Sequence, residues 1–375
     1  MSNLIAFSIP FFLLLIGVEL LLARRGGRRV YRLPDALSDL GCGVGQQVVL
    51  VLANAWLLGL EVRLFESHRW LTLEQPWLQW LVALVGVDFA YYWWHRLSHR
   101  VSILWAVHVV HHQSEDYNLA VALRQAVFSA FTMVPFFVPL LLLGVPPLVL
   151  AAANGIDTVY QFWIHTELVG RLGPLEHVLN TPSHHRVHHA VNARYLDKNY
   201  GGILIVWDKL FGTFVAETER PIYGTTRPFG SFNAAWAQLA YYPELVRRAR
   251  MLPRLVDKLK LPWMPPDWAP AHALEAPVTE RAKVESPARP SSRLYALVQF
   301  APLVPATFLL LLEGAALSPA LLLACIALVF LTLASLGGIL DARRWGWPLE
   351  AGRLGAMAVG AALWASGLLP PPGLG

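Results

Sequence analysis

Charged residues are scarce in this sequence. Aspartate, glutamate, lysine and arginine make up 15% of its 375 residues, whereas a typical soluble domain contains about 25%. Hydrophobic residues make up 55%, and the mean hydropathy is +0.45. The shortage of charge argues against an ordinary soluble domain and indicates that the chain resides in a membrane.

Cysteine is nearly absent as well. Cys42 and Cys325 lie far apart in apolar stretches, which argues against a disulfide framework and against a metal site built on cysteine. The net charge is +5, but no basic stripe alternates with exposed aromatic residues, so nucleic acid is not expected as a partner. Arginines in the loops of a membrane protein account for the positive excess.

Histidine, in contrast, is concentrated in three short runs. Their members are three or four residues apart, a spacing that aligns side chains on one face of a helix. Because imidazole is the commonest metal ligand, eight such side chains predict a dinuclear metal site with open positions. The spacing does not choose between zinc, iron and copper. The eight residues are His95, His99, His108, His111, His112, His185, His188 and His189.

The remaining histidines and the absent motifs narrow the chemistry. We expect His68, His177 and His272 to be ordinary surface residues. The HExxH pattern of zinc proteases does not occur, so metal-assisted peptide hydrolysis has no support. The sequence also contains no flavin or dinucleotide fingerprint, so electrons must come from an external donor.

Apolar segments set the expected topology. Five arginines between residues 24 and 32 follow the first segment and place that end in the cytoplasm by the positive-inside rule. The first two histidine runs then begin at the cytoplasmic membrane surface. We expect spans at 4–22, 36–60 and 77–94, a proline-broken hairpin at 127–153, and further apolar segments at 297–312, 320–340 and 354–369.

These segments divide the chain into four expected parts. Residues 1–76 form N-terminal transmembrane helices and loops, and residues 77–220 form the histidine-rich domain. Residues 221–293 form a cytoplasmic helical region that ends in a linker at 262–290, whose composition resists compact packing. Residues 294–375 form a C-terminal region of three transmembrane helices without histidine, for which no catalytic role is expected.

The histidine runs and their surroundings resemble the fatty acid hydroxylase/sterol desaturase superfamily of integral-membrane di-iron oxygenases. The resemblance covers roughly residues 33–218. Within the superfamily, the chain most resembles the alkylglycerol monooxygenase-like branch. The stretches that carry it are DFAYYWWHRLSH at 88–99, HHQSEDYN at 111–118, ALRQ at 122–125, LNTPSHHRVHH at 179–189, YLDKNYGG at 195–202 and WDKLFGT at 207–213.

The resemblance implies an all-α integral membrane protein, in which a transmembrane helix bundle has a cytoplasmic helical cap that carries the metal site. It also implies a ninth ligand, for which His165 in QFWIHTE is the candidate. Some members have a histidine four residues earlier, where this chain has Gln161, so Gln161 is a further candidate ligand. His184 would point about 100° away from His185 on a helix, and we expect it to lie behind the ligands.

An imidazole that binds a metal through one nitrogen carries hydrogen on the other nitrogen, and this N–H needs an acceptor. The acceptors are commonly carboxylates or backbone carbonyls. The acids nearest the histidines in the sequence are Asp88, Glu115, Asp157, Asp197 and Asp208. Arg124 and Gln125 are candidates for binding a polar headgroup or a reductant.

The implied reaction uses two iron ions and O2 to hydroxylate or desaturate a lipid, or to cleave an ether lipid by hydroxylating the carbon beside the ether oxygen. The resemblance also implies tetrahydrobiopterin as a possible electron donor. The expected location is the cell inner membrane, with the site facing the cytoplasm. The alternatives are a membrane metal transporter, against which the lack of an internal repeat argues, and a metal- and lipid-binding protein without oxygenase activity.

Overall fold

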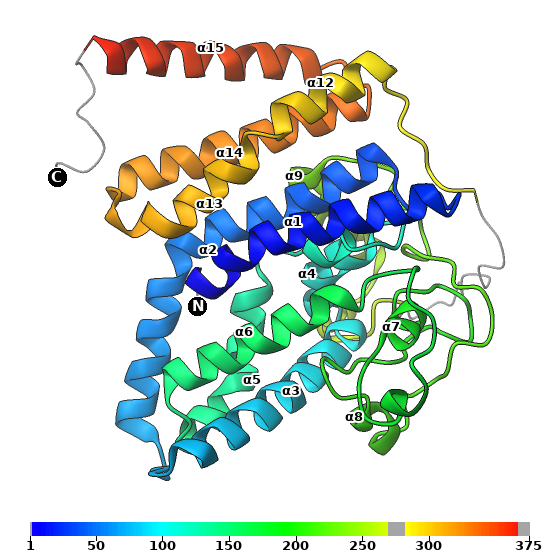
Figure 1. Cartoon of the computed structure of the whole chain (residues 1–375), viewed down its shortest axis with the longest axis vertical. Helices are drawn as coiled ribbons and strands as arrows, with labels where there is room; N and C mark the ends of the chain where they lie inside the picture. The colour runs from blue at the N-terminus through cyan, green and yellow to red at the C-terminus, as the bar shows by residue number, and fades with distance from the viewer. Residues whose placement is uncertain (1, 269–281, 367–375) are drawn as a thin grey trace.

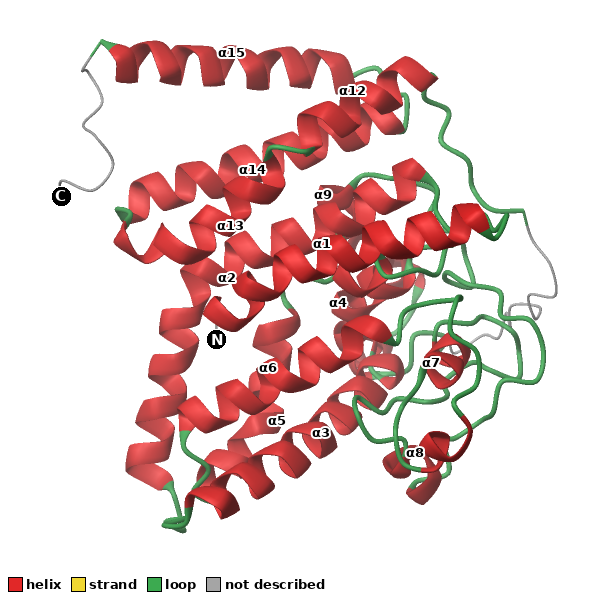
Figure 2. Ribbon diagram, viewed as in Figure 1, coloured by secondary structure: helices red, strands yellow, loops and turns green. Residues whose placement is uncertain are grey.

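The computed structural model describes residues 2–268 and 282–366, and within these ranges all regular secondary structure is helical apart from two isolated β-bridges (Figure 2). This confirms the expected all-α class. The α-helices are α1 (Ser2–Arg25), α2 (Leu33–His68), α3 (Pro76–Arg100), α4 (Ser102–His112), α5 (Ser129–Leu142), α6 (Pro147–Trp163), α7 (Pro182–His188), α8 (Val206–Leu210), α9 (Ala234–Ala237), α10 (Tyr241–Met251), α11 (Leu255–Lys260), α12 (Pro290–Phe300), α13 (Leu303–Glu313), α14 (Pro319–Leu340) and α15 (Gly346–Ala365). Short 3₁₀ turns are η1 (Val121–Leu123), η2 (Gly173–His177), η3 (Leu261–Trp263) and η4 (Gly314–Ala316).

Four helical stretches in the described ranges are long and apolar enough to cross a membrane: Ile5–Arg25, Leu33–His68, Pro290–Ala316 and Pro319–Leu340. The chain is therefore a multi-pass membrane protein. Helices α3 and α15 also form where apolar segments were expected, but they are not among the four. Charged and histidine side chains in α3 and the Glu350–Arg353 ion pair in α15 lower their apolar content. Part of the last expected segment, 367–369, lies outside the described residues.

The expected hairpin is present as α5 and α6, but its break is not at the first two prolines. Pro135 and Pro139 lie inside α5. Helices in a membrane bundle tolerate proline because neighbouring helices and side chains can satisfy the backbone groups that it leaves without a partner. The helix is followed by Gly144, whose φ is +88°. A side chain there would meet the carbonyl oxygen of Leu71, so glycine is required both by the conformation and by the close approach.

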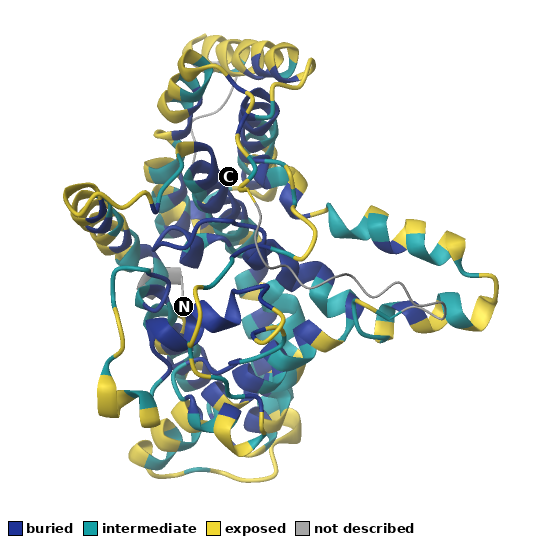
Figure 3. Ribbon diagram, turned by 90° about the vertical axis from the view of Figure 1, so that its right-hand side faces the viewer, coloured by how far each residue is buried: buried dark blue, intermediate teal, exposed yellow. Residues whose placement is uncertain are grey.

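The two largest apolar cores join most of the long helices. One joins α3, α5 and α6 around Val87, Leu141 and Leu150. The other joins α2, α9, α12 and α14 to α4 and includes Val107 and Val110. The C-terminal helices thus share a core with the helix that carries the second histidine run. Helix α15, at the top of Figures 1 and 3, is mostly exposed.

The loops around α7 and α8 gather at one end of the helix bundle, at the right of Figure 1. Part of the linker expected to resist packing is held at this end. Lys283 donates to Asp116 Oδ1 at 2.6 Å, and the backbone N–H of Val284 donates to Glu115 Oε2 at 2.6 Å. These hydrogen bonds attach residues 283 and 284 of the linker to the end of the bundle. Residues 269–281 of the linker lie outside the described residues.

Candidate metal centre

Nine buried histidines meet at the end of the bundle where the loops gather. The last turns of α3 supply His95 and His99, and α4 supplies the second run. His165 follows the end of α6, and α7 with its C-cap supplies the third run. Their ring nitrogens form two groups, each with all atoms within 4.8 Å of one another: His95, His99, His108, His112 and His188, and then His111, His165, His185 and His189. His68 and His177 are exposed, and neither is in these groups. His272 lies outside the described residues.

Within each group the Nε2 atoms converge on one another. The Nε2–Nε2 distance is 3.2 Å between His111 and His165, and 3.0 Å between His165 and His185. In the other group, the Nε2 atom of His112 lies 3.2 Å from the Nε2 atoms of both His108 and His188. Two nitrogen ligands that each lie about 2.0–2.1 Å from one zinc ion are separated by about 3.0–3.4 Å. The observed spacing therefore matches ligands around a shared metal ion.

For four of the nine rings, a backbone carbonyl fixes which nitrogen can face a metal. Nδ1 of His111 donates to the carbonyl of Arg124 at 3.1 Å, and Nδ1 of His165 donates to the carbonyl of Gln161 at 2.7 Å. Nδ1 of His95 donates to the carbonyl of Tyr200 at 2.8 Å, and Nδ1 of His188 to that of Lys198 at 3.0 Å. Because a carbonyl can only accept, each Nδ1 carries hydrogen, and each neutral ring presents the lone pair of its Nε2.

The pair of His111 and His165 tests whether these residues fit a metal. Burial lowers the pKa of His111 to about 4 and holds the pKa of His165 well below its usual range, so both rings are neutral at pH 7. Their Nε2 lone pairs then face each other at 3.2 Å with no proton to share. A metal cation satisfies both lone pairs at once, and neutral imidazole nitrogen is a suitable donor for it. The buried Nε2 atoms of His95 and His99 also lack a hydrogen-bond partner among the described residues.

Acidic side chains hold the loop that presents the Tyr200 carbonyl. Asp208 Oδ1 and Oδ2 accept the backbone N–H groups of Tyr200 and Gly201, both at 2.8 Å. Asp88 Oδ1 accepts the N–H of Ile203 at 2.6 Å, and its Oδ2 accepts the indole N–H of Trp207 at 2.7 Å. These acids therefore reach His95 through the backbone and not by direct contact.

Asp197 is the acid that approaches an imidazole directly. Its Oδ1 lies 3.6 Å from Nδ1 of His99, and its Oδ2 accepts a hydrogen bond from Arg100 at 2.9 Å. Asp157 Oδ2 instead accepts the side-chain amide of Gln161 at 2.6 Å. Gln161 therefore directs its amide nitrogen at Asp157 and its backbone carbonyl at His165. Glu115 binds the backbone of Val284, in the linker.

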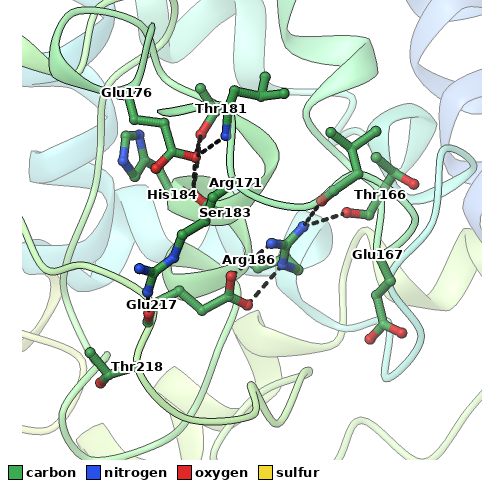
Figure 4. A network of polar contacts seen from close by, with 12 residues as sticks. Thr166, Glu167, Arg171, Glu176, Thr181, Ser183, His184, Arg186, Glu217 and Thr218 are labelled. Atoms are coloured by element: carbon green, nitrogen blue, oxygen red, sulfur yellow. Dashed lines mark hydrogen bonds and ion pairs between the residues drawn. The ribbon is translucent and has the colours of Figure 1, made fainter. Parts of the chain in front are cut away.

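The outer side of α7 is held by a separate polar network (Figure 4). Arg186 donates to Glu217 at 2.8 and 2.7 Å and to the carbonyl of Val169 at 2.7 Å. The ring of His184 packs against Phe214 with ring centroids 5.3 Å apart, and His184 belongs to neither nitrogen group. Sequence reasoning missed Arg186 and Glu217, although an arginine inside a histidine run was the available signal.

Arg124 does not bind a headgroup or a reductant in this fold. Its side chain is 1% exposed and donates to Asp39 Oδ1 at 3.1 Å, Ser38 Oγ at 2.9 Å, Gln113 Oε1 at 2.9 Å and the carbonyl of Val110 at 2.7 Å. A buried guanidinium needs this full set of acceptors. The side chain therefore fixes the carbonyl of Arg124 beside His111. The Gln125 amide donates to the carbonyl of Ala122 at 3.0 Å.

Several known proteins are similar to this chain in sequence. The profile of the fatty acid hydroxylase family matches residues 80–213, which include all nine histidines. Alkylglycerol monooxygenase of Homo sapiens is 40% identical over 344 residues, which are 89% of this chain and 77% of that protein. The same enzyme of Danio rerio is 40% identical over 352 residues, with 91% and 78% covered. An ornithine lipid hydroxylase of Rhizobium tropici is 30% identical over 151 residues, with 40% and 46% covered. No solved structure matches.

The similarity extends beyond residues 33–218, the range that the motifs had indicated. An alignment of 344 residues includes part of the C-terminal helices, and these helices share a core with α4. The chain therefore belongs to the fatty acid hydroxylase family, and it is an oxygen-dependent oxidoreductase with several membrane-spanning helices.

Proposed function

We propose that this chain is a di-iron monooxygenase that hydroxylates an ether lipid of the alkylglycerol type at the carbon beside the ether oxygen. The observation that carries the proposal is the 40% identity to alkylglycerol monooxygenases over most of the chain, together with nine converging imidazoles. Hydroxylation consumes O2, two electrons and two protons and releases water. The resulting hemiacetal separates into an aldehyde and a free glycerol hydroxyl. The electrons come from an external donor, for which we propose tetrahydrobiopterin.

The ligands in this proposal are the nine histidines. One group of five and one group of four would each hold one iron ion, which supplies the redox chemistry with O2 that zinc lacks. The chain's own part is to present Nε2 lone pairs in fixed orientations and to keep water away. Aromatic rings lie around the two groups: the ring of Trp105 is centred 5.5 Å from that of His112, and the ring of Tyr117 is centred 5.3 Å from that of His189.

We further propose that the metal centre faces the cytoplasm, in the inner membrane. Helix α1 ends beside the centre, where Arg28 donates to the carbonyl of Glu167, two residues after His165. Residues 24–32 at this end contain five arginines, and the loop between α14 and α15 contains Arg343 and Arg344. The loops 69–75, 143–146 and 314–318 connect other helix ends and contain Arg69 as their one basic residue. This asymmetry is that of the positive-inside rule.

The test uses purified full-length protein in detergent or nanodiscs. We expect about two iron ions per chain and O2-dependent release of a fatty aldehyde from an alkylglycerol lipid when tetrahydrobiopterin is supplied. His165→Ala should lower the iron content and abolish the aldehyde, whereas the matched variant at the exposed histidine, His177→Ala, should keep both. Unchanged iron content in His165→Ala would contradict the ligand assignment.

Lipid analysis of the host separates the remaining reactions. Loss of the gene should cause alkylglycerol lipids to accumulate. Disappearance of a hydroxylated lipid instead would favour the activity named for the Rhizobium relative, and disappearance of an unsaturated lipid would favour desaturation. Altered cellular metal content with unchanged lipids would favour transport and would reject the monooxygenase proposal.

A further inference from the structure

Residues 241–263, here called the arm, expose an unusual amount of apolar surface for a segment outside the candidate membrane spans. The arm comprises α10, α11 and η3. Six of its large apolar side chains are 49–70% exposed: Val246, Met251, Leu255, Val256, Leu259 and Trp263. A soluble surface rarely gathers so many apolar groups in one short segment, so the exposure indicates an interaction surface.

The arm is firmly attached through its other face. Leu245 and Leu261 are buried with Ala106 of α4 in one apolar cluster. The backbone N–H and the hydroxyl of Ser102 both donate to the carbonyl of Met264 at 2.8 Å. Arg248 donates to the carbonyls of Pro266 and Trp268, at 2.6 Å each. The exposed apolar side chains therefore belong to a packed element and not to a loose segment.

The exposed side of the arm is also basic. Besides Arg248, which is engaged in the attachment, the arm contains five arginines and lysines. It contains two acids, Glu244 and Asp257. Glu244 is already engaged by Arg247 at 2.5 Å. Four of the basic residues form no ion pair with any residue that the structure describes: Arg250, Arg254, Lys258 and Lys260.

Apolar and basic side chains lie next to one another on the surface of α10. A wide, open surface hollow of about 650 Å³ lies along α10, over Tyr242, Pro243, Val246, Arg247, Arg250 and Met251. Val246 and Met251 can contact an acyl chain here, next to Arg247 and Arg250, which can contact an anionic headgroup. The arm packs on α4, which begins directly after α3, so it lies at the same end of the bundle as the metal centre and the arginines of residues 24–32.

We propose that the arm lies in the membrane interface and binds a surface of anionic phospholipids. Its exposed apolar side chains enter the boundary between headgroups and acyl chains, as in interfacial amphipathic helices. Its four basic residues outside ion pairs lie among the phosphates, where a negative surface attracts them within about 10 Å. This role is independent of the reaction that the metal centre catalyses.

The first experiment measures the depth of the arm in the full-length protein. A spin label is attached to Leu259→Cys in a Cys42→Ala, Cys325→Ala background, in nanodiscs of phosphatidylcholine with phosphatidylglycerol. Leu175→Cys, at a 56% exposed position in η2, is the matched reference. We expect O2 to relax the Leu259 label more than a water-soluble nickel complex does, and the reverse at Leu175. A label at Leu259 that the nickel complex reaches as readily as at Leu175 overturns the proposal.

The second experiment tests the charge. A variant with Arg250, Arg254, Lys258 and Lys260 all changed to glutamine is compared with the parent in nanodiscs with and without phosphatidylglycerol. The parent label should lie deeper in the anionic nanodiscs, and this difference should vanish in the variant. Unchanged iron content verifies that the variant is folded. A label protected from both relaxants in a dimeric protein would assign the surface to a second copy and would reject the membrane proposal.

Discussion

Individual acids act on the histidines through the backbone. Asp208 and Asp88 accept hydrogen bonds from the loop 200–207, and a carbonyl of that loop accepts the ring N–H of His95. A carboxylate in direct contact with every imidazole would bring several negative charges into a buried centre, at a high cost in desolvation. Neutral carbonyls fix the tautomers of four rings without that charge. Asp88 and Asp208 stay behind the carbonyl of Tyr200, and Asp197 approaches His99 directly.

Replacing Asp208 with asparagine tests this indirect role. The amide keeps one accepting oxygen, so the N–H of Tyr200 or that of Gly201 loses its acceptor. We expect iron to be retained about 10–100-fold more weakly, as is typical for groups that orient metal ligands. The measurement is iron content after dialysis against graded chelator. Glu74→Gln, at an exposed loop position, is the control; equal retention in both variants would contradict the role.

The buried histidines also make the metal-free protein sensitive to acid. Burial lowers the folded-state pKa of His111 to about 4, while an unfolded histidine titrates near ~6.5. The unfolded chain therefore takes up protons first, and stability that is complete above ~6.5 falls as the pH approaches 4. We expect the unfolding temperature of chelator-treated protein to drop between pH 7 and pH 5. A constant unfolding temperature over that range would show that the histidines are accessible to protons in the folded state.

At the scale of elements, α2 is the helix against which the second histidine run is positioned. It has 36 residues, or about 54 Å at 1.5 Å per residue, which exceeds the ~30 Å of a bilayer core. Its N-terminal part supplies Asp39 to Arg124, and Gly43 allows η1 to approach closely. A Cβ atom at Gly43 would lie 2.6 Å from the carbonyl oxygen of Leu123, directly before Arg124.

Gly43→Ala should therefore push η1 and the carbonyl of Arg124 away from His111. We expect a loss of about 1–3 kcal/mol in unfolding free energy, as for other overpacked positions, and weaker retention of iron. The same change in the same helix at Gly59, where an added Cβ atom would have no neighbour within 4 Å, should be neutral or stabilising by about 0.5–1 kcal/mol. Thermal unfolding in detergent and iron content compare the two, and similar behaviour would reject the contact.

The elements were predictable from the sequence to different degrees. Apolar length identified α1, α2 and α14, and histidine spacing identified the inward faces of α3, α4 and α7. Prolines indicated the hairpin, and its turn lies at Pro146 and Pro147, whereas Pro135 and Pro139 are accommodated inside α5. The carbonyl acceptors could not be predicted, since every residue has a carbonyl and only the fold selects those of Arg124, Gln161, Lys198 and Tyr200. Arg124 was misjudged because its acceptors lie up to 86 residues away.

In the whole molecule, the C-terminal helices contribute no histidine but support the metal centre. Leu333 and Leu336 of α14 share a buried core with Val107 and Val110, which flank His108 and His111 in α4. The membrane bundle and the centre are therefore one packed unit, which agrees with a similarity that extends along most of the chain.

Deletion of residues 289–375 should consequently abolish iron binding although every histidine of the two nitrogen groups remains. The deletion removes α12 to α15 and exposes the core residues of α2 and α4. A shorter deletion, 346–375, removes α15, which contributes nothing to that core, and should keep most of the iron. Gel filtration in detergent and iron analysis distinguish them. Full iron content in the longer deletion would show that the first 288 residues fold independently.

The main-chain acceptors also determine how the centre tolerates mutation. A substitution at Arg124, Gln161, Lys198 or Tyr200 changes the side chain but leaves the carbonyl that receives the imidazole in place. Lys198 can therefore vary over evolution without removing the acceptor itself. The buried side chain of Arg124 also fixes the local backbone path, so Arg124 should vary much less. Selection then acts on the residues that fix that path, and a survey of natural variants should find strong constraint at Asp88, Asp208, Gly43 and Arg124 as well as at the histidines.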